Sequence, residues 1–342
     1  MSFKVIITRD FDHMSEVASE LVINDAKEQL TQKDRYTLGL ATGNSPTGLY
    51  KHFAKAVNEG SVASSRIVSF NLDEYVGLPG ENAQQRTLHP ESYSFFMIQE
   101  LFGLLSRKFH ESNVPWGTLI DQEILERELN GNPDDWEEQG IDKGKAIVIR
   151  NKARSAYLQW IRSEVLDGYA EKITVSGGID LQVVGVGGRG HVAFHEAGIP
   201  FENNKMLLVK LDENTVANAV EDGHFTTREK SPRYAVSMGA ELVYRARTVI
   251  LLANGARKAE PVAASLLNDV TPLIPISYGQ ILDKTGGRMI YVIDKMAAEA
   301  LDGYEESLAH RGIDVEDLSE GPPARRVRDL TFFRDPETGA MG

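Results

Sequence analysis

Six short apolar runs recur along this chain, and segments of helical period lie between them. The runs are Lys4–Ile7, Tyr36–Leu40, Arg66–Phe70, Asp180–Gly185, Thr248–Ala253 and Met289–Ile293. The clearest helical segment carries Met14, Val17, Leu21 and Leu30 on one stripe. Strands that alternate with helices pair in parallel and need helices on both faces of the sheet. We therefore predict an α/β fold with a doubly wound, mostly parallel open sheet.

Composition limits the function classes that remain. The 342 residues, 42% of them hydrophobic, can bury the core of one large domain or of a domain with an insertion. The absence of cysteine excludes disulfides and thiolate chemistry, and the net charge of −13 argues against a nucleic-acid-binding surface. No run approaches the ~18 apolar residues of a membrane span, and the first residues lack the apolar core of a signal peptide. We expect a cytoplasmic protein without nucleic-acid or membrane partners.

One of the predicted strands ends in a run of glycines. Leu181–Val184 leads into Gly185-Val186-Gly187-Gly188-Arg189-Gly190, and His191 and Glu196 follow. Glycine lets a ligand approach the backbone closely, so the run predicts a binding loop. An imidazole beside that loop can take and return a proton near neutral pH. Taken alone, the pattern also fits a structural histidine after a nucleotide-binding turn.

Two further strands lead into polar residues. Leu38–Ala41 precedes Thr42-Gly43-Asn44-Ser45-Pro46 and the start of a helix, where free N–H groups suit a phosphate. An ordinary capped loop is the alternative. Ile67–Phe70 is followed by Asp73 and Glu74, at the sheet edge where open α/β folds bind ligands. Adjacent strand residues point to opposite faces, so one acid can serve the site and the other has a structural role.

Taken in order, these three segments resemble the glucosamine-6-phosphate deaminase family. The matching motifs are Thr42-Gly43-Asn44-Ser45-Pro46, Asn71-Leu72-Asp73-Glu74-Tyr75-Val76-Gly77-Leu78 and the turn Gly185–Glu196. The resemblance continues at Pro232–Gly239, Gly255–Ala259 and Ile274–Ser277, and covers about residues 1–115 and 155–300. It implies a Rossmann-like sheet of the deaminase/isomerase type, a sugar-phosphate substrate, no cofactor and a homo-oligomer.

The resemblance also implies a role for individual residues. The family's reaction opens the ring of a 2-amino-2-deoxyaldose phosphate, moves a proton between C2 and C1, and releases ammonia. Asp73 is then the proton-transfer base, His191 the ring-opening acid/base and Glu196 a supporting carboxylate. Binding of the substrate and its phosphate is assigned to Thr42, Gly43, Asn44, Ser45, Gly187, Gly188, Arg189 and Lys258. The alternatives are a turn cap for Asp73, a helix cap for Glu196 and an exposed surface position for Lys258.

Several positions depart from the family pattern. Arg189 stands where the family has an Asp that orients the catalytic imidazole, and a guanidinium has no acceptor for a ring N–H. His195 replaces an Asn; with His191 it has the spacing of a zinc pair on a helix, but the reaction needs no metal and we expect none. The phosphate-binding Arg that follows Val-Ala-Asn is missing after Val216–Asn218, where the nearest candidates are Arg228 and Arg233. The basic residue of allosteric activation aligns near Met206, so we do not expect that regulation.

Two segments lie outside the resemblance. Residues of about 117–150 are acidic and replace a much shorter family connection; a solvated helical insertion is the simplest interpretation, and a subunit contact or a lid are the alternatives. We expect one α/β domain over residues 1–302 with that insertion, and an extension over residues 303–342. The extension is either an arm that packs on a neighbouring subunit or a partly ordered terminus.

Three functions fit these observations. The first is an amino-sugar-phosphate deaminase/isomerase that acts on glucosamine 6-phosphate or a close analogue. The second is a sugar-lactone hydrolase like 6-phosphogluconolactonase, although the Asp73–Leu78 and Ala193–Glu196 motifs favour the first. The third is a sugar-phosphate sensor in which Arg189 has removed turnover.

Overall fold

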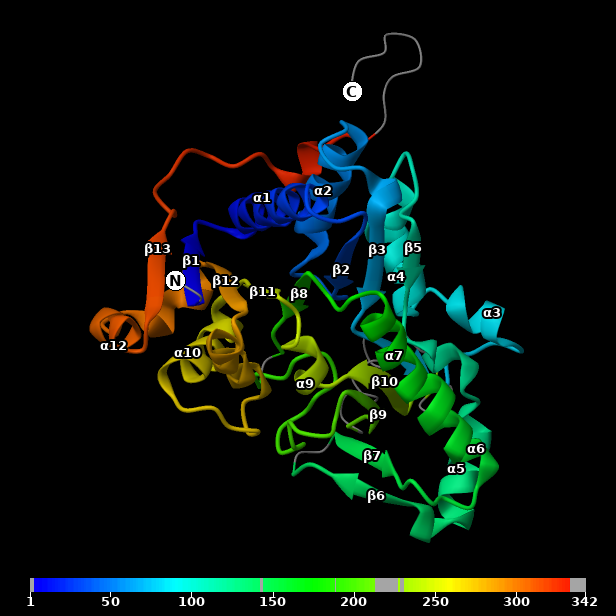
Figure 1. The fold of residues 1–342 in the computed structure, drawn as a ribbon. Coiled ribbons are helices and arrows are strands. Elements are labelled where there is room, and N and C mark those ends of the chain that lie inside the picture. The colour runs from blue at the N-terminus through cyan, green and yellow to red at the C-terminus, as the bar shows by residue number, and fades with distance from the viewer. Residues whose placement is uncertain (1–2, 142–143, 188, 213–226, 228–230, 333–342) are drawn as a thin grey trace.

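A computed structural model describes residues 3–141, 144–187, 189–212, 227 and 231–332, and it contains two sheets (Figure 1). The larger sheet has eight strands, and every neighbouring pair in it is parallel. In order across the sheet they are β13 (Ile313–Asp317), β1 (Phe3–Thr8), β12 (Arg288–Asp294), β11 (Thr248–Ala253), β8 (Leu181–Gly185), β2 (Tyr36–Leu40), β3 (Ile67–Asn71) and β5 (Glu111–Asn113). The predicted α/β fold and its six strands are confirmed.

The order of these strands creates a switch point between β2 and β8. After β2 the chain moves outward to β3 and β5, and after β8 it moves in the opposite direction to β11 and β12. The loops that leave β2 and β8 therefore diverge at their carboxyl ends. Open α/β sheets bind ligands at such a point.

The smaller sheet was not predicted from the sequence. It is antiparallel, and its strands in order are β4 (Asp73–Val76), β10 (Tyr234–Met238), β9 (Met206–Lys210), β7 (Lys145–Ile149) and β6 (Trp136–Gln139). A single residue, Leu72, separates β3 from β4, so the chain passes from the large sheet into the small one at Asp73. Asp73 is thereby held at the junction of the two sheets.

The acidic segment of residues 117–150 is only partly helical. Its helix α5 (Gln122–Gly131) buries Leu125 and Leu129, and Asp121 caps the helix by accepting bonds from two backbone amides. The rest includes β6 and β7, which extend the small sheet through pairing of β7 with β9. The segment therefore differs from the solvated helical insertion that we expected, because its apolar residues complete a core.

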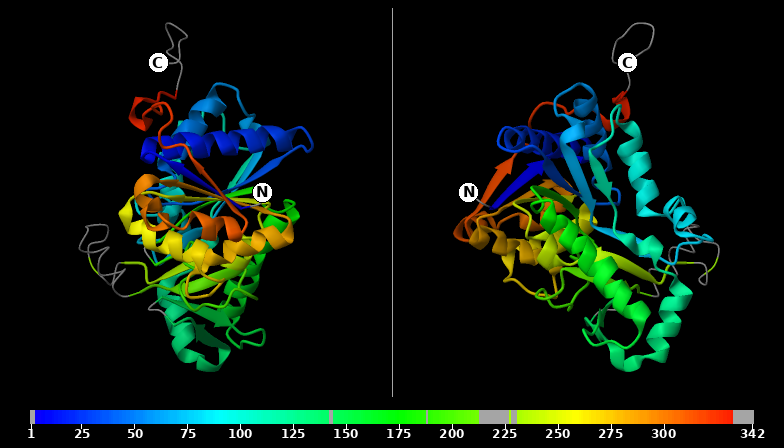
Figure 2. Two further views of the ribbon diagram at one scale, coloured as in Figure 1. Left: turned by 90° about the vertical axis from the view of Figure 1, so that its left-hand side faces the viewer. Right: turned by 45° about the vertical axis from the view of Figure 1, so that its right-hand side comes forward.

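Helices cover both faces of the large sheet. Along the chain they are α1 (Phe11–Leu30), α2 (Thr47–Asn58), α3 (Ala83–Thr87), α4 (Tyr93–Glu100), α5, α6 (Ala156–Trp160), α7 (Gly168–Val175), α9 (Ala240–Val243), α10 (Ala259–Leu267), α11 (Lys295–Ala298) and α12 (Glu305–His310). Figure 2 shows α1 and α2 on one side of the sheet and α10, α11 and α12 on the other. Among the described residues, no helix has the length and apolarity to cross a membrane.

Helix α1 shows how the sequence produces this packing. Asp10 caps it by accepting a 3.0 Å bond from the amide of His13. Met14, Ala18, Val22 and Ala26 recur every fourth residue and are fully buried against the sheet. The predicted stripe residues Val17, Leu21 and Leu30 flank this row and are partly buried.

The chain beyond residue 302 continues the large sheet instead of leaving it. Strand β13 pairs in parallel with β1, since Ile313 and Val315 alternate with acidic residues as an edge strand requires. The following residues cross α1 and α2, where the Val327 amide donates to Asp12 Oδ1 at 2.9 Å and Asn58 Nδ2 donates to the Phe332 carbonyl at 2.7 Å (Figure 1). The described part of the expected extension therefore packs on its own chain.

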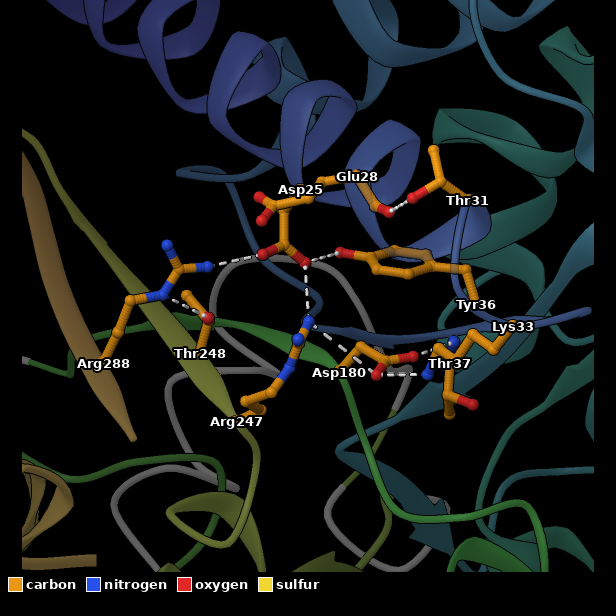
Figure 3. Close-up of polar contacts among 10 residues, drawn as sticks. All are labelled: Asp25, Glu28, Thr31, Lys33, Tyr36, Thr37, Asp180, Arg247, Thr248 and Arg288. Atoms are coloured by element: carbon orange, nitrogen blue, oxygen red, sulfur yellow. Dashed lines mark hydrogen bonds and ion pairs between the residues drawn. The ribbon is translucent and has the colours of Figure 1, made fainter. Parts of the chain in front are cut away.

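A buried ion cluster joins the amino ends of the strands, at the sheet edge opposite the switch point (Figure 3). The carboxylate of Asp25, from α1, accepts bonds from Tyr36 Oη at 2.9 Å and Arg288 Nη2 at 2.6 Å, and lies 3.4 Å from Arg247 Nη2. Arg247 also approaches Asp180, which accepts from the Thr37 amide. The cluster ties one helix to four neighbouring strands.

We expect Asp25→Ala to lower the free energy of unfolding by about 2 kcal/mol, because it leaves the buried Tyr36 hydroxyl without its acceptor. Both guanidinium groups are nearly half exposed and regain water, which keeps the cost below that of a fully buried pair. Urea unfolding measures the change, and Glu28→Ala, an exposed acid of the same helix, is the control. Equal stability of the two variants would contradict this role for the cluster.

Candidate active site

A cavity of about 370 Å³ lies at the carboxyl ends of β2, β3, β8 and β11. It opens at the switch point of the large sheet, where the fold predicts a ligand. Of the residues singled out from the sequence, Thr42, Gly43, Asn44, Ser45, Asp73, Gly187, His191 and Lys258 line it. Four segments that are far apart in the chain therefore share one cavity.

The loop after β2 is shaped for an anion. The hydroxyl of Tyr50, from α2, bonds both the amide and the carbonyl of Ala41 and fixes the start of the loop. Gly43 has a φ of +102°, which an L side chain rarely adopts, and the space beside its Cα is open. Helix α2 then begins without a side-chain cap. The Thr47 amide donates to the Asn44 carbonyl at 3.3 Å, and the next amides, of Gly48 and Leu49, suit an anion.

Two cations face this loop from the other side of the cavity. Arg257 and Lys258 follow β11, and both line the cavity. The turn before them depends on Gly255, which has a φ of +86° and whose amide donates to the carboxylate of Asp294 at 3.0 Å. Lys258 Nζ donates to the Val186 carbonyl at 2.6 Å, and burial together with the charge of Arg257 lowers the pKa of Lys258.

Asp73 is the buried acid of the cavity. Its side chain is almost inaccessible, and burial raises the pKa of Asp73 to about 8. The neighbouring charge of Glu74 adds to the increase, and a hydrogen bond from Thr42 opposes it. A carboxylate with a pKa near the working pH is suited to take a proton and return it.

Glu74 points away from Asp73 and has a different role. Its carboxylate accepts bonds from the amides of Tyr75, Tyr93 and Ser94 and from the Ser94 hydroxyl, at 2.8–3.0 Å. These bonds hold the first turn of α4, from which Tyr93 reaches the cavity wall. The division of roles expected from strand alternation is therefore visible: Asp73 lines the cavity and Glu74 holds a helix.

The glycine-rich turn presents His191. A Cβ on Gly187 would lie 1.9 Å from Nε2 of His191, so only glycine leaves room for the imidazole. Gly190 has a φ of +77° and Ala193 a φ of +49°; the latter is unusual for a residue with a side chain. The Phe194 amide donates to Ser237 Oγ at 3.0 Å and anchors the end of the turn.

Glu196 lies behind His191 and outside the cavity lining. Its Oε2 is 3.4 Å from His191 Nδ1 and 3.8 Å from Arg189 Nη2. The carboxylate is 12% exposed, whereas half of the Arg189 side chain is exposed. The acid that faces the imidazole is therefore Glu196, five residues after it, while Arg189 competes for the same oxygen.

His195 is a structural residue. It is fully buried, and burial lowers its pKa to about 4. Its Nδ1 accepts from the Ala240 amide at 3.1 Å, which leaves Nε2 to donate to the Ile199 carbonyl at 3.0 Å. Both ring nitrogens are thus engaged within the protein, and the spacing of His191 and His195 does not create a metal pair.

Other residues depart from the expected set or were missed. Arg189 and Glu196 do not line the cavity, and Gly188 and Arg228 lie outside the described residues. Arg233 bonds Glu126 at 2.8 Å and is not part of the lining. The polar and aromatic lining residues that the sequence analysis did not assign to the site are Asn254, Arg257, Tyr93 and Phe194. The Gly255–Ala259 motif contains Arg257 directly before Lys258 and could have identified it.

No protein-family model matches the chain. Individual relatives match over most of it. It is 31% identical to a glucosamine-6-phosphate deaminase of Clostridium acetobutylicum over 298 residues, which cover 87% of this chain and 100% of that protein. It is 32% identical to a glucosamine-6-phosphate deaminase of Clostridioides difficile over 306 residues, which cover 89% of this chain and 99% of that protein.

Solved structures share the fold. A monomeric glucosamine-6-phosphate deaminase superposes with a TM-score of 0.62 at 23% identity, over 87% of this chain and 99% of that one. A 6-phosphogluconolactonase from Thermotoga maritima superposes with a TM-score of 0.54 at 16% identity, over 85% of this chain and 100% of that one. The fold is thus common to both kinds of protein.

Proposed function

The chain belongs to the glucosamine-6-phosphate deaminase family, and we propose on that basis that it converts a 2-amino-2-deoxyhexose 6-phosphate and water to a ketose 6-phosphate and ammonia. The observation that carries this proposal is the shared cavity. It combines an uncapped helix start and two cations, suited to a phosphate, with an acid and an imidazole suited to proton transfer.

We assign the phosphate to the loop Thr42–Ser45, the start of α2, Arg257 and Lys258. Family members place an Arg after a Val-Ala-Asn stretch, and this chain lacks it. Arg257 supplies a guanidinium at the cavity wall and is our candidate for its replacement, since planar guanidinium groups pair well with phosphate oxygens.

At the other end of the cavity, His191 takes the proton of the anomeric hydroxyl and delivers a proton to the ring oxygen, which opens the sugar. Asp73 then removes the proton from C2 and returns it to C1, while the amine gives up one proton and O1 gains one, so that C2 carries an imine and C1 a hydroxymethyl group. Water adds to that imine, and ammonia leaves. Glu196 faces Nδ1 of His191 and stabilises the charged imidazole.

An ammonia-release assay on a panel of hexosamine 6-phosphates tests this proposal, with 6-phosphogluconolactone as the comparison substrate. We expect ammonia and a ketose phosphate in equal amounts from at least one hexosamine phosphate. Hydrolysis of the lactone without ammonia release from any amino sugar would instead indicate a lactonase. Binding without turnover of either class would indicate a sensor.

Arg189 bears on the choice of substrate. Its guanidinium lies 3.8 Å from the Glu196 oxygen that faces His191, so that carboxylate is shared between the guanidinium and the imidazole. We expect weak turnover of glucosamine 6-phosphate, and Arg189→Asp should raise it about 10- to 100-fold, the equivalent of one charged hydrogen bond. Arg189→Asp both removes a cation and adds a carboxylate. Arg189→Met only removes the cation, so comparison of the two variants separates these effects. Wild-type turnover of about 1–10³ per second, with no gain in either variant, would show that Arg189 does not affect substrate choice.

A further inference from the structure

The hairpin of β6 and β7 reaches the active-site turn from the acidic segment of residues 117–150. The described residues at its tip are Gly140, Ile141 and Gly144, and Lys145 Nζ donates to the Gly140 carbonyl at 2.7 Å. The amide of Ile141 donates to the Ala197 carbonyl at 3.2 Å. The hairpin tip therefore bonds the residue that directly follows Glu196.

Gly144 lies directly against the side chain of Glu196. A Cβ on Gly144 would lie 2.7 Å from Cγ of Glu196 and 3.4 Å from its Cδ, so the Glu196 side chain rests against the bare backbone of the hairpin. The Glu196 carboxylate is 12% exposed and has little space on this side. The hairpin therefore contacts the same side chain whose carboxylate faces His191.

The hairpin is itself fixed in place. Strand β7 pairs with β9 in the small sheet, and Asn204 Nδ2 bonds both Gln139 Oε1 of β6 and the Pro200 carbonyl. The pairing with β9 therefore holds the hairpin in the small sheet, and Asn204 links β6 to Pro200, four residues after Glu196. Movement of the tip would move the carboxylate.

We infer that Gly144 is a positioning residue, through which the hairpin tip sets the distance between the Glu196 carboxylate and the His191 imidazole. The inference rests on the proposed function of His191 and Glu196. It gives the acidic segment a role in the active site, in place of the solvated surface that we expected from its composition.

The test uses Gly144→Ala in the full-length protein. Gly144 needs no positive φ, and the three heavy atoms nearest to the added methyl group all belong to Glu196. Gly131→Ala, in the same segment, is the matched control, because a Cβ there meets no described atom within 4 Å. We expect Gly144→Ala to lower kcat about 10- to 100-fold, as displacements near 1 Å do, with KM changed less than about twofold. Gly131→Ala should match the wild type.

A double-mutant cycle separates positioning from a general structural defect. If Gly144 acts through Glu196, Gly144→Ala has no further effect on kcat in a Glu196→Ala background. An equal loss in both backgrounds, or wild-type kcat in Gly144→Ala, would overturn the inference. If Gly144→Ala does not fold, Lys145→Met is used instead. It removes the hydrogen bond to the Gly140 carbonyl without placing a Cβ against Glu196, and the same double-mutant cycle applies to it.

Failure of the proposed function has a different signature. If the wild-type protein releases no ammonia from any hexosamine phosphate, the proposed function is wrong. The effect of Gly144 on the position of Glu196 can then still be tested without an activity assay. A crystal structure of Gly144→Ala then decides the inference: we expect the distance from Glu196 Oε2 to His191 Nδ1 to grow beyond its present 3.4 Å. An unchanged distance would overturn it.

Discussion

Asp73→Asn will lower kcat for ammonia release about 10²- to 10⁴-fold, the usual cost of losing a general base. The amide keeps the shape of the side chain at the junction of β3 and β4 but takes no proton from C2. In the wild type, kcat/KM should rise with pH up to about 8, where the pKa of Asp73 lies. Steady-state kinetics from pH 6 to pH 9 measure both effects.

The same substitution should stabilise the fold. The pKa of Asp73 is about 8 in the folded chain and near 3.9 when unfolded, so the folded state binds more protons between these values. Wild-type stability therefore falls as pH rises from about 4 to about 8, and Asn removes that loss. From pH 5 to pH 7 the stability of Asp73→Asn relative to the wild type should grow by roughly 2–3 kcal/mol.

Glu74→Gln is the comparison variant for kcat; because the charge of Glu74 raises the pKa of Asp73, it is not a control for the pH dependence. In the wild type, the Glu74 carboxylate accepts hydrogen bonds from α4 and from its own strand. The side-chain nitrogen of Gln, which replaces one carboxylate oxygen, cannot accept such a bond. We expect this variant to lose stability. A variant of Asp73 that keeps wild-type kcat, or one whose relative stability does not change with pH, would contradict the role of Asp73.

Lys258→Met will raise KM for the sugar phosphate about 10- to 100-fold, because a charged hydrogen bond to a phosphate contributes roughly 1.5–3 kcal/mol. Arg257→Met should have a smaller effect of about tenfold, since its side chain is exposed and screened by solvent. Titration calorimetry with fructose 6-phosphate measures the same losses without turnover.

Lys172→Met on α7 is the control for charge, because Lys172 pairs with Glu111 outside the cavity lining. If only kcat falls in Lys258→Met, the ammonium acts on the reaction and not on the phosphate. Unchanged affinity in both cavity variants would remove Arg257 and Lys258 from the phosphate site.

The central strands could be predicted because they are buried on both faces and therefore mostly apolar. The edges of the large sheet could not. Strand β5 is Glu111-Ser112-Asn113, which has no apolar pattern, and β13 alternates Ile and Val with acids in a segment that resembles a tail. In β6, Trp136 is followed by Glu137, Glu138 and Gln139, and pairing with β7 determines its conformation more than local propensity does.

The candidate site shows a similar division. Asp73 and the loop Thr42–Ser45 could be assigned because parallel strands end at one edge. The approach of Glu196 to His191 could not, since it depends on a turn with Ala193 at a φ of +49° and on contact with Gly144. Arg257 was missed because the expected phosphate Arg belongs to another part of the chain.

The most direct test follows the nitrogen of the substrate. The wild-type protein, in amounts close to those of the sugar, is incubated with glucosamine 6-phosphate labelled with ¹⁵N at the amine, and the label is followed by NMR. We predict that it appears as ammonium in step with a ketose 6-phosphate, and that Asp73→Asn slows both at least about 10²-fold. Label that stays on the sugar while wild-type protein binds it would contradict the deaminase function.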